Sequence, residues 1–105
     1  MLRRSHLYWA RLDKRRPVLV VSIDARNARA DDVMVVPCST TIREAPTHVL
    51  LGKGEGGLLR SGVLKCEQMT TLPMSDVLEP AIGSLGLQRM REVERAILRA
   101  IGVPA

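Results

Sequence analysis

The segment PVLVVSI, residues 17–23, limits the possible folds of this chain more than any other stretch. It is a continuous run of mostly β-branched residues, which is typical of a strand that is buried on both sides. A second run of the same kind is VMVVPCST at residues 33–40. Pro37 predicts a bulge or an edge within it, because proline has no backbone N–H to donate to a neighbouring strand. The chain is therefore expected to fold around buried strands.

Shorter segments complete this picture. Further strands are predicted over residues 6–12, 47–51, 62–73 and 77–85, with a loop or short helical turn at 24–32 and a mobile glycine-rich loop at 52–57. The end of the chain has the period of a helix. Its apolar residues follow one another at helical spacing: Leu87, Met90, Val93, Ile97 and Ile101. Gly102 lies at the C-terminal cap position. Residues 1–105 are expected to form one domain of the mainly β (α+β) class, a small twisted sheet or barrel closed by a C-terminal helix.

The charge balance favours a polyanionic partner. Sixteen basic and eleven acidic residues give a net charge of +5. Aromatic residues are limited to Tyr8 and Trp9, so nucleic-acid binding is expected to use phosphate contacts and hydrogen bonds rather than stacked bases. Cys38 and Cys66 belong to no metal-binding motif and are expected to be buried, reduced thiols, with a disulfide as the alternative. We expect no membrane span and a cytoplasmic location.

The stretch GVLKCEQMTTLP, residues 62–73, places opposite charges inside an apolar run. The strand period of two puts Lys65 and Glu67 on one face and Gln68 on the other. On these residues alone, a solvated salt bridge is favoured over a pair that faces a substrate. A stripe formed by Arg91, Arg95 and Arg99 on the predicted helix is likewise expected to be a solvated face.

Four segments in the same order resemble the MazF/PemK (Kid) family of bacterial toxin endoribonucleases. They are RRPVLVVS (15–22), VVPCSTT (35–41), GVLKCEQMTTLP (62–73) and IGSLGLQRMREVERAILRAIG (82–102). The resemblance implies an SH3-like barrel of the kind shared with CcdB, usually as a homodimer. It implies cleavage of single-stranded RNA with no metal or cofactor, through attack of the 2′-OH to leave a 2′,3′-cyclic phosphate and a 5′-OH. It also implies an antitoxin partner whose acidic tail covers the RNA groove.

The resemblance also implies a set of site residues. Arg16 would hold the scissile phosphate and assist proton transfer, while Ser39, or Thr40 in its place, would supply a hydroxyl. Lys65 would hold phosphate and Glu67 would be the base for the 2′-OH, at positions where the family has Arg and Asp. RNA contacts are expected from the following residues: Lys14, Arg15, Thr40 and Arg43. Gln68 is expected to be structural, and both His6 and His48 are left outside the core site.

Two other functions are compatible with the sequence. One is a gyrase-inhibiting toxin similar to CcdB, although such proteins depend on a Trp at the end of the terminal helix and the only Trp here is Trp9. The other is a family member that binds RNA or its antitoxin and cuts weakly. The short connection LDKRRP, residues 12–17, is shorter than in many family members and predicts a more open site.

Overall fold

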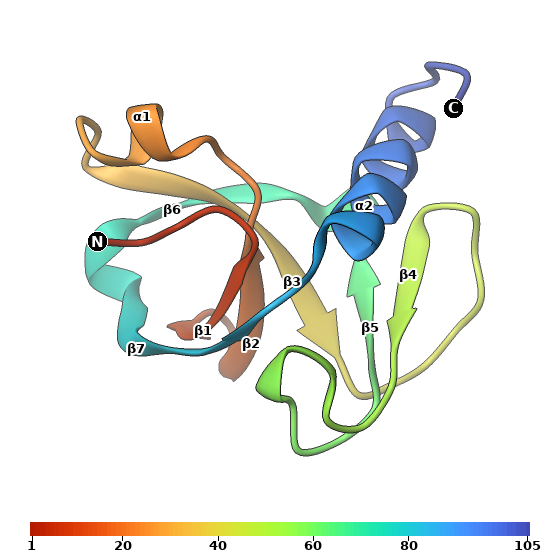
Figure 1. The fold of residues 1–105 in the computed structure, drawn as a ribbon, viewed down its shortest axis with the longest axis horizontal. Coiled ribbons are helices and arrows are strands. Elements are labelled where there is room, and N and C mark those ends of the chain that lie inside the picture. The colour runs from red at the N-terminus through yellow and green to blue at the C-terminus, as the bar shows by residue number, and fades with distance from the viewer.

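The buried run near residue 17 forms a central strand of one antiparallel sheet (Figure 1). The computed structural model describes residues 1–105. In it, β2 (Arg15–Val20) pairs with β1 (His6–Arg11) on one side and with β3 (Asp32–Ser39) on the other. β2 ends at Val20, three residues before the predicted end, and residues 24–27 form the short helix α1 (Asp24–Asn27).

The remaining strands extend this sheet in both directions. β7 (Val77–Ser84) pairs with the free side of β1. The first half of β3 pairs with β6 (Thr70–Pro73), and its end pairs with β5 (Gly62–Lys65), which in turn pairs with β4 (His48–Leu51). Pro37 lies where the neighbour of β3 changes from β6 to β5, so the break in pairing occurs where proline predicted an irregularity. The fold class is confirmed, although no hydrogen-bonded pair joins β4 to β7 to close the barrel.

Helix α2 (Leu87–Ala100) covers one of two apolar cores (Figure 1). Met90, Val93 and Ala96 are buried in the larger core, as the helical period predicts for the first two. The predicted helix is confirmed, although Leu87 is 72% exposed and Ile101 is 67% exposed. Both lie at or beyond its terminal turns, outside the part that packs on the sheet. No helix is long and apolar enough to cross a membrane.

The predicted long strand over residues 62–73 is interrupted. β5 ends at Lys65, residues Cys66–Gln68 form one 3₁₀ turn (η2), and β6 begins at Thr70. Because of this turn, β5 pairs with the end of β3 while β6 pairs with its first half. The turn also buries the Cys66 side chain in the core. The prediction that Lys65 and Glu67 share a strand face was therefore wrong. Both cysteines are buried free thiols, as expected.

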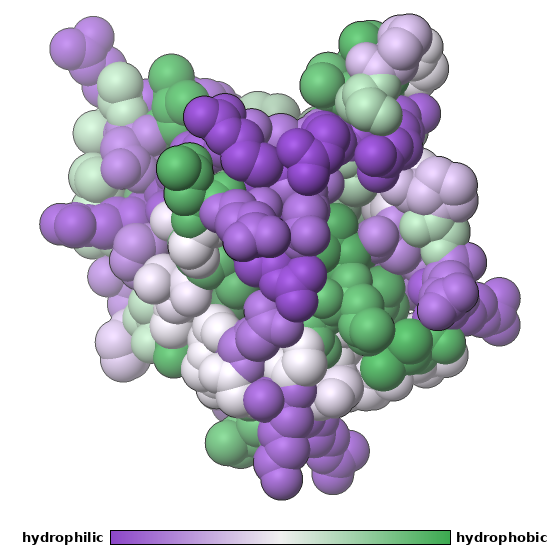
Figure 2. All heavy atoms as spheres, turned by 45° about the vertical axis from the view of Figure 1, so that its right-hand side comes forward, coloured by the Kyte–Doolittle hydropathy of each residue, from purple (hydrophilic) through white to green (hydrophobic).

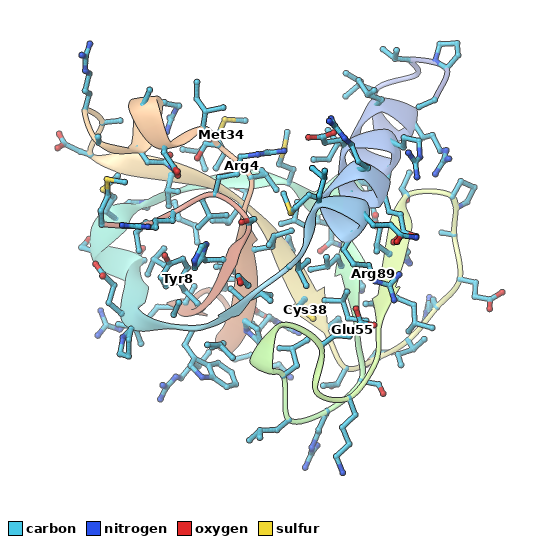
Figure 3. All side chains as sticks on the ribbon, viewed as in Figure 1. Arg4, Tyr8, Met34, Cys38, Glu55 and Arg89 are labelled. Carbon is cyan, nitrogen blue, oxygen red and sulfur yellow. The ribbon has the colours of Figure 1, made fainter.

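The glycine-rich loop after β4 is anchored rather than free. Its short helical turn η1 (Glu55–Gly57) is tied to α2, because Arg89 donates to both oxygens of Glu55 at 2.7 and 2.8 Å. Figure 3 shows these two side chains pointing toward each other. Gly57 has φ +81° and lies so close to β7 that a Cβ there would be 2.2 Å from the Ile82 carbonyl oxygen. The last short turn, η3 (Met74–Asp76), joins β6 to β7.

Candidate functional site

Two grooves meet at the ends of β2 and β3. We call the first, of about 680 Å³, the loop groove because the loop between η1 and β5 forms one wall. The second, of about 590 Å³, is called the turn groove because the η2 turn forms part of its wall. The residues that line both grooves are Lys14, Arg16, Cys38, Ser39 and Thr40.

The topology explains why these residues meet. Arg16 is the second residue of β2, just after the tight β1–β2 hairpin, and Ser39 ends β3, which runs antiparallel beside β2. The start of one strand and the end of its antiparallel neighbour lie at the same edge of the sheet. Cys38, labelled in Figure 3 near the end of β3, lies beneath this edge. Burial raises the pKa of its thiol to about 11, so the thiol stays protonated at neutral pH.

Arg16 is held by a carboxylate that the sequence analysis did not single out. Its Nε and one terminal nitrogen donate to the two oxygens of Asp13 at 3.1 and 3.2 Å. The Arg16 hydrogen bond lowers the pKa of Asp13 to about 2, and the same contact raises the pKa of Arg16. Both groups are therefore charged at neutral pH. Because Asp13 is solvent-exposed, this ion pair contributes little stability and can exchange for another anion.

The two hydroxyls at the end of β3 differ in their surroundings. Ser39 is buried, and its Oγ accepts a hydrogen bond from the backbone N–H of Thr41 at 3.1 Å. This local contact leaves the Ser39 O–H proton free to be donated. Thr40 is exposed. Ser39 and Thr40, the two candidates for the predicted hydroxyl, therefore both line the grooves; Ser39 is buried and Thr40 is exposed.

Lys65 and Gln68 line the turn groove, and Glu67 does not. The 3₁₀ turn rotates the side chains after Lys65 away from strand alternation, which brings Gln68 to the same side as Lys65. The prediction that Gln68 points to the opposite face was therefore wrong. Lys65 forms no ion pair with Glu67, whose carboxylate is bound elsewhere.

Glu67 belongs to a hydrogen-bonded network with His48. Glu67 accepts from the Thr47 hydroxyl at 3.0 Å, and His48 Nε2 lies 3.0 Å from its other oxygen. His48 Nδ1 is 2.7 Å from the backbone carbonyl of Arg43. The hydrogen bond to the Arg43 carbonyl, and to a smaller extent the contact with Glu67, raise the pKa of His48. The pKa of Glu67 is lowered, because its contacts to His48 and Thr47 outweigh the opposite effect of its partial burial. Because both ring nitrogens face acceptors, the protonated form of His48 ties the loop carbonyl of Arg43 to Glu67 of the η2 turn.

This network predicts a pH-dependent stability. The raised pKa of His48 stabilises the fold fully below its ordinary value of 6.5, and this contribution is lost as the pH rises through the folded value. The Glu67 contribution is present above 4.5 and is lost as the pH falls. His48→Gln should therefore flatten the decrease in Tm between pH 6 and pH 9. Thermal melts of the wild type and H48Q at both pH values test this, and an unchanged decrease in H48Q would contradict it.

Almost all of the charged side chains in the linings of the two grooves are basic. The cationic residues of the two linings are Lys14, Arg15, Arg16, Arg43, Arg60 and Lys65. All predicted RNA contacts are among the groove residues, although Arg15 lines only the loop groove and Arg43 only the turn groove. Asp13 is the one acidic residue in either lining. Arg60 and Gln68 were not predicted as site residues, and no periodic pattern in the sequence marks them.

The other candidate groups lie elsewhere. His6 contacts the backbone carbonyl of Arg4 through Nδ1 and lines neither groove. On α2, Arg91 pairs with Glu94, and Arg99 donates to the Pro46 carbonyl. Figure 2 shows a band of hydrophilic side chains with a hydrophobic area beside it on the face that contains α2. No three His, Cys, Asp or Glu side chains are arranged to hold a metal ion.

Comparison with known proteins gives a consistent result. The family model described as "PemK-like, MazF-like toxin of type II toxin-antitoxin system" matches residues 3–101. The chain is 31% identical over 100 residues to the probable endoribonuclease MazF5 of Mycobacterium tuberculosis, covering 93% of this chain and 91% of that protein.

Solved structures agree with these matches. The M. tuberculosis toxin MazF-mt6 superposes with a TM-score of 0.87 at 29% identity, covering 95% of this chain and 99% of that one. A mycobacterial endoribonuclease solved in complex with its cognate antitoxin gives a TM-score of 0.88 at 28% identity, covering 100% and 99%. The match to the family model spans nearly the whole chain, and the fold agrees over its full length. This chain therefore belongs to the PemK/MazF family of type II toxins.

Proposed function

We propose that this protein is an endoribonuclease toxin that cuts single-stranded RNA across the shared wall of the two grooves. The observation that carries the proposal is the convergence of Arg16, Ser39, Thr40 and Lys65 on one basic groove, although they come from three separate strands and a loop. The relatives named as endoribonucleases support the same activity.

The proposed reaction needs no metal. The 2′-OH of one nucleotide attacks the adjacent phosphorus, the bond to the 5′-oxygen of the next nucleotide breaks, and the products are a 2′,3′-cyclic phosphate and a 5′-OH end. The proton leaves the 2′-OH, and one is delivered to the 5′-oxygen. The phosphorane transition state carries extra negative charge, so fixed cations and hydrogen-bond donors around it lower the barrier.

Three of the residues that line both grooves, together with Lys65 of the turn groove, have roles in this scheme. Arg16 releases Asp13 and binds the scissile phosphate through the same two nitrogens, since guanidinium geometry fits both anions. Lys65 adds a second cation from across the turn groove. The hydroxyls of Ser39 and Thr40 donate to phosphate oxygens. Once bound to this phosphate, Arg16 would also assist delivery of the proton to the leaving oxygen.

Glu67 as the base for the 2′-OH is a separate step of the proposal. Its two oxygens are engaged by Thr47 and His48, and it lines neither groove, so this step requires RNA binding to release one oxygen and to turn the carboxylate into the turn groove. A base is expected to contribute roughly 10²–10⁴-fold to the rate. Glu67→Gln should therefore lose roughly 10²-fold or more while H48Q loses much less. Equal losses in the two variants would assign Glu67 to positioning the loop instead of proton transfer.

The basic surface of the two grooves also suits an acidic protein partner. We propose that an acidic antitoxin segment competes with RNA for the six cations of the groove linings. We also propose a homodimer, as implied for the family.

A turnover assay on a pool of RNA sequences tests the proposed function. The protein should cut the pool with multiple turnovers at a restricted set of short sequences. RNA binding without turnover would support a weak or inactive family member instead.

A further inference from the structure

Trp9 occupies an unusual place for the only tryptophan in the chain. It lies in β1 between buried Tyr8 and Ala10, but its own side chain is on the outer face and is 36% exposed. Its register neighbours are Pro17 on β2 and Leu78 on β7, so the indole lies across the sheet surface. It belongs to neither apolar core. A large aromatic ring on this face is therefore not needed to fill the interior.

The indole ring forms part of the loop groove and carries a cation. The guanidinium carbon of Arg15 is 5.1 Å from the centre of the Trp9 ring, a cation–π distance. Arg15 is exposed and has no carboxylate partner, so little holds it on the ring. An aromatic face covered only by an exposed arginine without a carboxylate partner is accessible to another flat group.

The rest of the loop groove favours a nucleotide as that group. Its lining contains Lys14, Arg15, Arg16 and Arg60 and no acidic residue. The lining also contains apolar residues, among them Pro17, Leu58 and Ile82. The volume of about 680 Å³ lies within the range of small-molecule sites, roughly 300–1,000 Å³. A lining that combines apolar residues with cations matches a flat base attached to phosphates.

A second copy of this chain is a poor occupant for the same groove. A twofold contact would place identical surfaces against each other and bring two sets of these four cations together. No carboxylate in the lining would compensate them. The charge pattern therefore selects a polyanion.

We propose that the loop groove is a base-binding subsite, in which one unpaired RNA base stacks on Trp9 beside the scissile phosphate. The subsite rests on the proposed function. It adds stacking of a base on an aromatic ring, a type of contact that the low aromatic content of the sequence had argued against. Arg15 leaves the ring and pairs with the phosphate of the bound nucleotide. Because the two grooves share Arg16, Ser39 and Thr40, the stacked base lies next to the cleavage centre. Trp9 would then help to determine which sequences are cut.

The single tryptophan makes the proposal directly measurable. The probes are seven-nucleotide DNA strands of random sequence, which lack the 2′-OH and cannot be cut, and abasic strands with the same number of phosphates. Base-containing strands should quench the Trp9 emission saturably, and abasic strands should not. In an anisotropy assay with labelled strands, Trp9→Leu should weaken binding roughly 5- to 100-fold. Trp9→Phe should recover most of the affinity.

The possible results separate the subsite from the proposed function. Equal affinity for abasic strands, or unchanged binding by a folded W9L, would overturn the subsite while leaving RNA binding intact. If no base-containing strand binds and no RNA is cut, the proposed function fails and the subsite fails with it. Trp9 emission that depends on protein concentration without any strand would show that a second copy covers the ring, which also contradicts the proposal.

Discussion

Arg16→Ala is expected to reduce the rate of RNA cleavage by roughly 10²–10³-fold, the usual effect of removing one fixed donor from a developing negative charge. Arg16 is the only guanidinium that lines both grooves. Its ion pair with Asp13 is exposed, so the variant should keep the wild-type Tm within a few degrees. Initial rates on a defined RNA, with Tm measured in parallel, separate lost chemistry from lost folding.

Arg29→Ala is the matched control. Arg29 is an exposed arginine that lies outside both grooves. The substitution changes the net charge by the same amount, so any effect of total charge on RNA binding appears in both variants. If R16A and R29A lose activity equally, Arg16 has no special role at the phosphate.

Gly83→Ala is expected to destabilise the fold by about 2–3 kcal/mol, as overpacking against an immovable neighbour does. A Cβ on Gly83 would lie 2.3 Å from the Gly56 carbonyl oxygen and 2.9 Å from the Gly57 nitrogen. Both are backbone atoms that cannot rotate away. The η1 turn would have to move off β7, and it carries the loop that forms one wall of the loop groove. The Tm should decrease by roughly 10–20 °C, and cleavage should fall with it.

Gly52→Ala tests whether close contact is the cause. Gly52 lies in the same loop, but a Cβ there meets only a Glu55 side-chain oxygen at 3.5 Å, an ordinary contact. Its Tm should remain within a few degrees of the wild type. A G83A variant as stable as G52A would show that η1 moves freely, contrary to the anchoring by Glu55 and Arg89.

The sequence predicts the strands better than it predicts what happens between them. The β-branched runs locate β2 and β3, although β2 ends three residues early, because burial on both faces leaves a strong pattern. The η2 turn was missed, because Cys66, Glu67 and Gln68 contain no glycine or proline to mark a break. The anchoring of the glycine-rich loop was also missed, because it depends on Arg89, which is 34 residues from Glu55. Contacts between distant residues leave no local signal.

The sequence likewise predicts some features of the candidate site and not others. The Arg-Pro step and the hydroxyls after Pro37 lie together as the family resemblance implies, since antiparallel pairing of β2 and β3 brings them to one edge. Asp13 lies three residues before Arg16, a spacing at which an acid and a base in a tight turn commonly meet. Trp9 gave no signal of its own, because alternation along β1 identifies an outer face and not the groove that other segments build on it.

Analysis of the RNA ends in excess chelator tests the central claim most directly. Purified protein is incubated with RNA and EDTA, and the products are examined for end chemistry. The proposed mechanism predicts undiminished cleavage that leaves 5′-OH ends and 2′,3′-cyclic phosphates. Cleavage that stops in EDTA and returns with Mg²⁺, or products with 5′-phosphate ends, would contradict it.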